Sequence, residues 1–200
     1  MQRTLSGNGM SKFNGTLYHG SGRKFTEFDF SKLRVTDDFY GGPVYFTDTL
    51  SVAISYAKSM ARVAATGTPF VYTCSVDIAR VFDVDHVWSG QEIKDILPKD
   101  LDKFIRGAGL LTKGEDPFVT AAKLELGHTK LTGDQIFKGL SNGMTNTRAA
   151  REYLITKGYD GLRYNGGLNM NMRTKHDVFC PYKASAIKIQ KIQRVAKKTD

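Results

Sequence analysis

The sequence predicts a single α+β domain, and three observations predict it. Strand patterns stand near both ends of the chain, one amphipathic helix pattern follows the first strands, and short helical patterns fill the middle. Strands that are grouped apart from helices are typical of α+β proteins, whereas parallel βαβ sheets alternate the two. The 200 residues fit one domain. We place it at residues 15–193, between a flexible N-terminus (1–14) and a basic tail (194–200).

The N-terminal half contains short strand patterns separated by turn-rich segments. Residues 16–19 (TLYH) end at a small Gly-Ser-Gly loop, and residues 44–47 (VYFT) follow the turn-rich segment 37–43. Residues 70–76 (FVYTCSV) are rich in β-branched and aromatic side chains, which favours a strand. Residues 81–84 either continue that strand or start another.

One helix is predicted between these strands, from Leu50 to about Ala65. Thr47, Asp48 and Thr49 precede it, and their side-chain oxygens can cap the free N–H groups of a first helical turn. Apolar side chains recur at helical spacing along one face of this segment. They are Leu50, Ala53, Ile54, Ala57, Met60 and Ala61.

Residues 86–157 change in character and predict a helical insertion of three or four short helices. The sequence leaves open whether this insertion is a lid, a partner surface or filler. Strand patterns return at residues 159–164 (YDGLRY) and 177–182 (DVFCPY), with a flexible loop expected at 165–171. Residues 186–193 (AIKIQKIQ) fit either a final edge strand or part of a basic arm.

The composition limits the classes of partner and location. The chain has 29 Lys and Arg against 20 Asp and Glu, a net charge of +9. Such a surface attracts nucleic acid, acidic proteins or a polyphosphate such as a dinucleotide. No apolar stretch approaches the roughly 20 residues of a membrane span, and the N-terminus lacks the apolar core of a signal peptide. We therefore expect a cytoplasmic protein with no membrane contact.

Cysteine and glycine patterns exclude several kinds of site. Cys74 and Cys180 each lie in an apolar strand-like run, so we expect two buried thiols and no disulfide framework. No His/Cys cluster predicts a metal site. The sequence contains neither GxGxxG nor a P-loop, so a nucleotide would not bind through a Rossmann or Walker loop.

The first candidate binding residues stand at the end of the first strand pattern. His19 can donate from a ring nitrogen to a ribose hydroxyl, and Gly20 lets the main chain approach a carboxamide closely. The Ser21 hydroxyl can join the same carboxamide. Taken alone, this pattern also fits a structural histidine.

Two tyrosines form the second candidate cluster. Tyr45 lies in the strand pattern at 44–47, and Tyr56 lies two turns into the helix that follows. Because strand and helix fold back on each other, both side chains can reach one pocket wall. Two tyrosines that flank a flat heteroaromatic ring can clamp a nicotinamide. Taken alone, the pair also fits an ordinary core.

The two clusters together resemble the poly(ADP-ribose) polymerase and diphtheria-toxin-like ADP-ribosyltransferase superfamily. Its first two motifs are a His-Gly-Ser/Thr strand end and a Gly-x-x-Tyr-Phe strand, followed by a helix with a second Tyr. LYHGSGRKF and GGPVYFTDTLSVAISYA match them. Residues 148–190 are loosely similar to transferase domains of phage and mobile-element polyproteins. The matching residues are His19, Gly20, Ser21, Tyr45, Phe46 and Tyr56.

The resemblance implies a fold of split antiparallel β-sheets and NAD as the substrate, with no metal. It implies that His19 binds the ribose, that Gly20 and Ser21 bind the carboxamide, and that Tyr45 and Tyr56 enclose the nicotinamide. Phe46 belongs to the same binding motif. Arg23, with Lys24 and Arg34 near it, can meet the pyrophosphate, or these can be solvated surface charges.

The third motif of this superfamily is a Glu at the start of a late strand, and this chain has none there. A carboxylate is needed because positive charge develops on the ribose as nicotinamide leaves. One alignment puts Lys175 at the Glu position, and another puts Asp177 within one residue of it. Asp177 and Tyr45 are therefore our candidate catalytic residues. Glu125 and Glu152, on predicted amphipathic helices, are outside candidates.

The sequence thus predicts NAD-dependent mono-ADP-ribosyl transfer to a macromolecule, either a host protein or a nucleic acid. Polymer formation is not expected, because elongation in the superfamily depends on the missing Glu. A non-catalytic module that binds NAD or ADP-ribose is one alternative, and an NAD glycohydrolase is another. The late segments suggest a phage protein or bacterial effector that acts in the host cytoplasm. The oligomeric state stays open.

Overall fold

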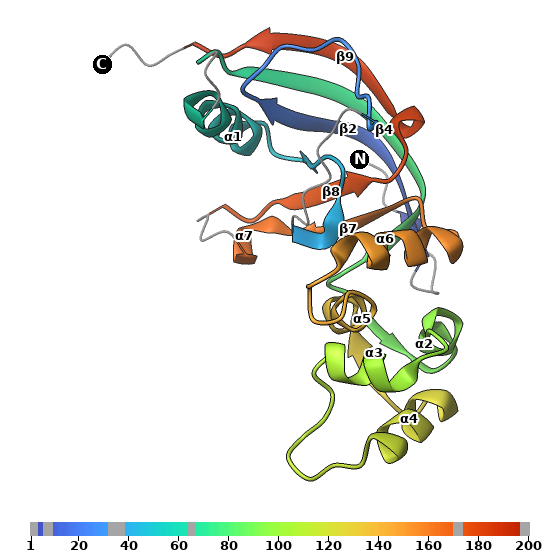
Figure 1. Cartoon of the computed structure of the whole chain (residues 1–200). Helices are drawn as coiled ribbons and strands as arrows, with labels where there is room; N and C mark the ends of the chain where they lie inside the picture. The colour runs from blue at the N-terminus through green and yellow to red at the C-terminus, as the bar shows by residue number, and fades with distance from the viewer. Residues whose placement is uncertain (1–3, 6–9, 32–38, 64–66, 170–173, 197–200) are drawn as a thin grey trace.

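A computed structural model describes residues 4–5, 10–31, 39–63, 67–169 and 174–196, and they form an α+β fold (Figure 1). The β-layer of β2, β4 and β9 lies over β7 and β8, with α1 beside it and the middle helices at the far end. The strands are β1 (Thr4–Leu5), β2 (Met10–Ser21), β3 (Phe46–Thr47), β4 (Phe70–Asp83), β5 (Val87–Ser89), β6 (Lys130–Thr132), β7 (Gly161–Asn165), β8 (Asp177–Pro181) and β9 (Ile187–Arg194). The helices are η1 (Phe39–Gly41), α1 (Leu50–Val63), α2 (Gly90–Ile96), α3 (Leu101–Gly107), α4 (Pro117–Leu126), α5 (Gly133–Leu140), α6 (Thr147–Thr156), α7 (Gly166–Asn169) and η2 (Ala184–Ala186).

The main sheet consists of two antiparallel groups that meet at two corners. In the described part of the chain its order is β1-β2-β3-β8-β7-β4-β9, and β2 also pairs with β4. One corner is the short β2–β3 contact at Tyr18 and Thr47, and the other is the parallel pairing of β4 with β7. The predicted α+β fold with split antiparallel sheets is therefore confirmed, with one parallel junction that makes the sheet mixed.

The long strand β4 is the centre of the sheet, and it confirms the first of the two alternatives for residues 81–84. It pairs with β2 along one edge and with β9 along the other. Its buried Tyr72, Cys74, Val76 and Ile78 fill the core between the two sheet groups, and Val71 packs with Ala53 and Ala57 of α1. Burial alternates along residues 72–78, because successive side chains of a strand point to opposite faces and one face lies on the core.

Strand β2 corrects the prediction of a loose end at residues 1–14. It begins at Met10, and the pairing of Phe13 with Ile78 of β4 lies inside that segment. The Phe13 ring contacts that of Phe179 on β8, with 4.2 Å between centroids. These partners are remote in sequence, so the polar local composition of residues 10–14 did not reveal them.

Strand β9 settles the two alternatives for residues 186–193 in favour of an edge strand. It pairs with β4 from Phe70 to Val76, and its Ile187, Ile189 and Ile192 pack on the core. Lys188 and Lys191 are exposed between them. Lysines on an edge strand discourage pairing with another chain. Lys188, Lys191 and Arg194 therefore belong to a folded strand, whereas residues 197–200 of the predicted basic tail lie outside the described residues.

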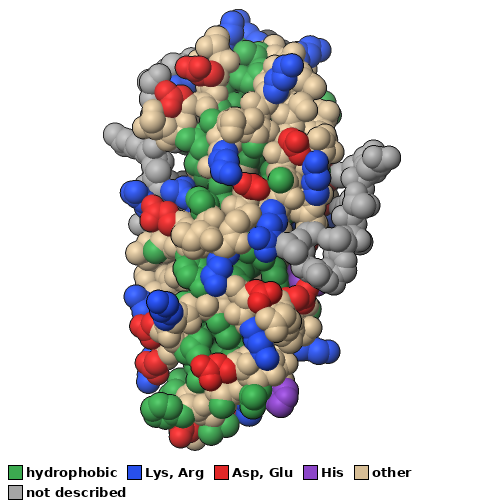
Figure 2. Space-filling model, turned by 90° about the vertical axis from the view of Figure 1, so that its right-hand side faces the viewer, with side chains coloured by type: hydrophobic (Ala, Val, Ile, Leu, Met, Phe, Trp, Pro, Cys, Tyr) green, Lys and Arg blue, Asp and Glu red, His purple; other side chains and the backbone are tan. Residues whose placement is uncertain are grey.

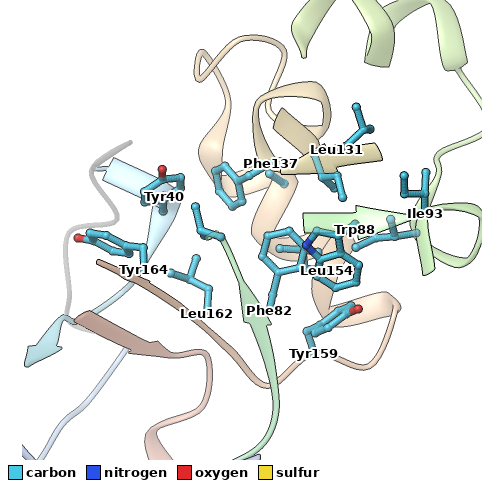
Figure 3. Close-up of a cluster of buried hydrophobic side chains, with 14 of the residues drawn as sticks. Tyr40, Phe82, Trp88, Ile93, Leu131, Phe137, Leu154, Tyr159, Leu162 and Tyr164 are labelled. Atoms are coloured by element: carbon cyan, nitrogen blue, oxygen red, sulfur yellow. The ribbon is translucent and has the colours of Figure 1, made fainter. Parts of the chain in front are cut away.

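The middle of the chain is helical, as predicted for residues 86–157, but it contains five helices, α2 to α6, where three or four were expected. The prediction missed the two-stranded pair β5–β6 inside it, because three-residue strands are too short to show a period. Trp88 of β5 is buried and stacks on Phe82 of β4, with 5.1 Å between centroids. Figure 3 shows this cluster, which joins the insertion to the sheet through Phe82, Leu154 and Leu162.

One predicted loop differs in the structure, and the two cysteines agree with their prediction. Residues 166–169 form the helical turn α7 where a flexible loop was expected; residues 170–173 lie outside the described residues. Cys74 and Cys180 are both buried and free, as predicted. Within the described ranges no helix is long and apolar enough to cross a membrane, and no group of three potential metal ligands gathers.

Helix α1 packs on β2 so closely that two glycines are required. The buried stripe of α1 is Ala53, Ala57 and Ala61, whereas the predicted Leu50 is 42% exposed. A Cβ atom on Gly20 would lie 2.2 Å from the Ala53 carbonyl oxygen. A Cβ atom on Gly22 would lie 2.6 Å from the Met60 carbonyl oxygen. Strand and helix backbones therefore touch directly.

Replacing Gly20 by Ala is expected to lower the free energy of unfolding by about 3 kcal/mol, because backbone atoms of α1 must move away. Urea denaturation measures this. Gly15→Ala in the same strand is the matched control, since its Cβ would meet only the tip of the Phe13 ring at 3.2 Å. Equal losses in the two variants would contradict the close-packing argument.

Candidate active site

A cavity of about 740 Å³ opens at the end of β2, beside the helix α1 that packs on this strand. Its walls come from the end of β2, the loop that follows it, the segment before β3, and one face of α1. Such a volume lies in the usual range of small-molecule sites. The lining residues are His19, Gly20, Ser21, Gly22, Arg23, Phe25, Thr26, Glu27, Phe28, Asp29, Gly42, Pro43, Val44, Tyr45, Tyr56, Met60 and Val63.

His19 is held in place by a backbone hydrogen bond and by aromatic rings. Its Nδ1 lies 2.8 Å from the Tyr45 carbonyl oxygen. A carbonyl oxygen only accepts, so Nδ1 carries the proton and donates. The rings of Phe28 and Phe46 lie 5.4 and 5.6 Å from the imidazole, centroid to centroid. Burial lowers the pKa of His19, although the bond to Tyr45 opposes this.

The neutral imidazole that results corrects the role predicted for His19. Since Nδ1–H is already used by Tyr45, the free nitrogen is Nε2, which accepts hydrogen bonds in this tautomer. A ribose hydroxyl would therefore donate to His19 and not accept from it. The contact also ties the two sequence clusters together, because the donor comes from the first and the acceptor from the second.

Both predicted tyrosines line the cavity, from different elements. Tyr45 precedes β3, and its hydroxyl oxygen accepts a hydrogen bond from the Gly42 N–H at 3.2 Å. Tyr56 lies on α1 and is 39% exposed. The backbone contact of α1 with Gly20 and Gly22 is what brings Tyr56 beside His19. The predicted convergence of His19, Tyr45 and Tyr56 on one cavity is therefore observed.

Three further predicted residues have places that the sequence did not reveal. Gly20 lines the cavity, but its missing side chain is required by α1. The Ser21 hydroxyl accepts from the Arg23 N–H at 3.1 Å and so shapes the turn after β2. Phe46 is not among the lining residues: it is 1% exposed and packs beneath the His19 ring. Phe46 is thus a support of the site, not a wall.

The loop after β2 is fastened to the sheet by one buried tyrosine. The Tyr72 hydroxyl accepts from the Phe25 N–H at 2.7 Å and lies 3.3 Å from the Arg23 carbonyl oxygen. The Phe25 ring stacks on that of Tyr72 with centroids 4.1 Å apart and planes 10° apart. These contacts hold the segment that carries Glu27 and Asp29 against the cavity. The sequence did not identify Tyr72 as part of the site, because no local pattern indicates its hydrogen bond to Phe25, 47 residues away.

The charged groups at the cavity come from this same loop. Arg23, Glu27 and Asp29 line it, whereas Lys24 is exposed and is not among the lining residues. Arg34 lies outside the described residues. Asp29 accepts from the Ser31 N–H at 3.0 Å and from the Ser31 hydroxyl at 2.6 Å, so its carboxylate closes a turn. Glu27 is an exposed side chain on the same loop.

Asp177, the predicted catalytic acid, does not line the cavity. It begins β8, is 5% exposed, and lies 2.7 Å from an Arg163 guanidinium nitrogen. The same guanidinium contacts Asp83 at 2.9 Å. The Asp177 N–H donates to Asp48 at 3.1 Å. These contacts give Asp177 a structural place at the junction of β4, β7 and β8; its catalytic role stays a prediction.

The other acids considered from sequence lie away from the cavity. Glu152 forms an exposed ion pair with Arg148, 2.8 Å between nitrogen and oxygen, one turn earlier on α6. Glu125 is exposed on α4, and neither residue is among those lining the cavity. Both match the surface role that amphipathic helices predict.

Comparison with known proteins gives one distant structural match. No family model and no curated protein matches the sequence. A chain of the M. tuberculosis MbcT–MbcA toxin–antitoxin complex is similar in structure, with a TM-score of 0.49 and 11% sequence identity. The match covers 94% of this chain and 87% of that chain.

Asp177→Ala is expected to lower the free energy of unfolding by about 1.5–3 kcal/mol, because Arg163 loses a charged hydrogen-bond partner in a largely buried place. Urea denaturation at neutral pH measures it. Asp102→Ala on α3 is the control, since its ion pair with Arg106 is exposed, and its stability should hardly change. If Asp177→Ala is as stable as the parent chain, the structural role is wrong.

The lowered pKa of His19 predicts that the free energy of unfolding falls as the pH falls. Because its folded pKa is lowered from the ordinary 6.5, its full contribution is present above pH 6.5 and declines below that value, where the unfolded chain takes up a proton more readily. His19→Gln should therefore lose less stability than the parent chain between pH 7.5 and 5.5. Urea denaturation at both pH values tests this. Parallel pH profiles for the two proteins would contradict it.

Proposed function

We propose that this chain binds NAD in the cavity and transfers its ADP-ribosyl group to a macromolecule. The observation that carries the proposal is the convergence of His19, Tyr45 and Tyr56 on one cavity of suitable size. These residues come from two separate sequence motifs and three elements. In an ordinary hydrophobic core, the three side chains would pack against their neighbours and would not all line an open cavity.

The cavity chemistry fits a nicotinamide riboside. The neutral His19 can accept a hydrogen bond from a ribose hydroxyl through Nε2. Tyr45 and Tyr56 offer aromatic faces for the nicotinamide ring, and backbone groups at Gly20 and Ser21 suit its carboxamide. Arg23 lines the same cavity and is suited to the pyrophosphate.

The transfer needs a carboxylate near the ribose. The bond between C1′ and the nicotinamide nitrogen breaks, its electron pair leaves with nicotinamide, and the acceptor nucleophile bonds to C1′ and loses a proton. Positive charge on the ribose is stabilised by a nearby anion. Glu27 is the cavity acid best suited to this, because Asp29 closes its own turn and Asp177 is paired with Arg163. Asp177 stays the alternative that the sequence predicts.

Two other functions fit the same cavity. A module that binds NAD or ADP-ribose without cleaving it is favoured by the engagement of Asp177 with Arg163. An NAD glycohydrolase would use the same groups with water as acceptor. For transfer, the acceptor would be a protein or nucleic acid in the cytoplasm of a host cell. The net charge of +9 favours an acidic acceptor. On the face shown in Figure 2, however, Lys and Arg are interspersed with Asp and Glu.

The proposal is tested with adenylate-labelled NAD, following nicotinamide release and label transfer into bacterial lysate and nucleic acid. His19→Ala and Tyr56→Ala are expected to weaken NAD binding about tenfold or more, measured by calorimetry. Glu27→Gln is expected to lower kcat about 100-fold with little change in NAD affinity. Glu125→Gln, at an exposed acid outside the cavity, is the matched control and should act as the parent chain.

The outcomes separate the candidate functions. Nicotinamide release without labelled acceptor would favour the glycohydrolase. Binding without release would favour the non-catalytic module. Loss of turnover in a well-folded Asp177→Asn protein, with Glu27→Gln active, would return the acid to Asp177. No NAD binding by the parent chain would overturn the proposal.

A further inference from the structure

The helical insertion contacts the segment that leads into Tyr45. This segment begins with Tyr40 in η1, whose φ of 58° lies in the left-handed region that few non-glycine residues adopt. Such a conformation persists only where surrounding contacts hold it. The contacts of residues 40–42 with the insertion and the sheet show what holds it.

The Tyr40 side chain is buried against helix α5 of the insertion. It is 3% exposed, and its hydroxyl donates to the Asp134 carboxylate at 2.8 Å. Its ring meets Phe137 edge-on at 5.1 Å and Tyr164 of β7 at 4.9 Å, as Figure 3 shows. Burial is the main cause that raises the pKa of Tyr40, and the hydrogen bond to Asp134 raises it further. The phenol therefore stays protonated and donates this hydrogen bond.

The next residue is held by helix α6. The Gly41 carbonyl oxygen accepts from the Arg151 guanidinium at 3.0 Å. Its φ of 60° and the Thr147 carbonyl oxygen, 2.6 Å from where a Cβ would lie, exclude a side chain there. Arg151 is 110 residues away in sequence, so the contact joins the insertion to the cavity segment.

The contacts then continue to the cavity wall. The Gly42 N–H donates to the Tyr45 hydroxyl, and the Tyr45 carbonyl accepts from His19. Hydrogen bonds therefore run from α5 and α6, through residues 40–42, to Tyr45 and His19. Gly42, Pro43, Val44 and Tyr45 line the cavity.

We propose that the helical insertion is a rigid platform that positions the cavity wall, with Tyr40 and Arg151 as its positioning residues. Neither residue is among those lining the cavity, so neither is expected to touch the ligand. This role differs from the three that the sequence left open, a lid, a partner surface or filler: the insertion sets where Tyr45 presents its ring and where His19 is held.

The test uses the full chain and two readouts. Amide hydrogen exchange is measured for residues 41–46 and for β4, and NAD affinity is measured by calorimetry. Tyr40→Phe and Arg151→Met each remove one donor and keep most of the side chain. We expect exchange at residues 41–46 to rise about tenfold in each variant, with exchange in β4 unchanged, and NAD to bind about tenfold more weakly.

The matched control is Arg148→Met, three residues earlier on α6, where the guanidinium forms an exposed ion pair with Glu152. It should leave both readouts unchanged. Arg151→Lys, which can still donate to the Gly41 carbonyl, should restore part of the protection.

Unchanged exchange at residues 41–46 in both Tyr40→Phe and Arg151→Met would overturn the inference. So would a rise of equal size in β4, because that would report a general loss of stability. The affinity readout rests on the proposed function, whereas the exchange readout does not. If the parent chain fails to bind NAD, the proposed function is wrong. The exchange result alone then decides whether the insertion positions the cavity wall.

Discussion

The direct contact between the backbones of β2 and α1 is the constraint on which the site depends. Gly20 and Gly22 leave no side chain between strand and helix, and the alanine stripe of α1 completes the close fit. That fit sets the position of Tyr56 relative to His19. Because interiors pack at nearly crystalline density, a strand and a helix that touch in this way have little freedom to shift.

The cavity beside this contact combines walls that are close in sequence with supporting contacts from distant residues. Its walls come from residues 19–29, 42–45 and one face of α1, which are close in sequence. The groups that hold those walls come from further along the chain: Tyr72 of β4 fastens the first loop, and Arg151 and Asp134 of the insertion hold the second. The Arg163 ion pairs with Asp83 and Asp177 join the strands behind them.

Sequence patterns predicted the cavity residues better than their supports, and the reason is physical. His19, Tyr45 and Tyr56 stand in short motifs whose spacing carries information, whereas Gly20 owes its identity to a helix that begins 30 residues later. Asp177 was judged from its place at a strand start, and its partner Arg163 could not be read from local sequence. The strand β2 before residue 16 and the pair β5–β6 were missed because tertiary partners, not propensity, define them.

The order of these supports along the chain has a consequence for synthesis. The cavity walls are made before β7, β8 and β9, which span residues 161–194, and β4 lacks one of its neighbours until β9 is made. Strand pairing between segments so far apart is slow, because the intervening chain must first be closed into a loop. A nascent or truncated chain would thus carry every residue of the cavity and still lack the structure that shapes it. A producing cell would meet the finished site only after β9 has been made and has paired with β4.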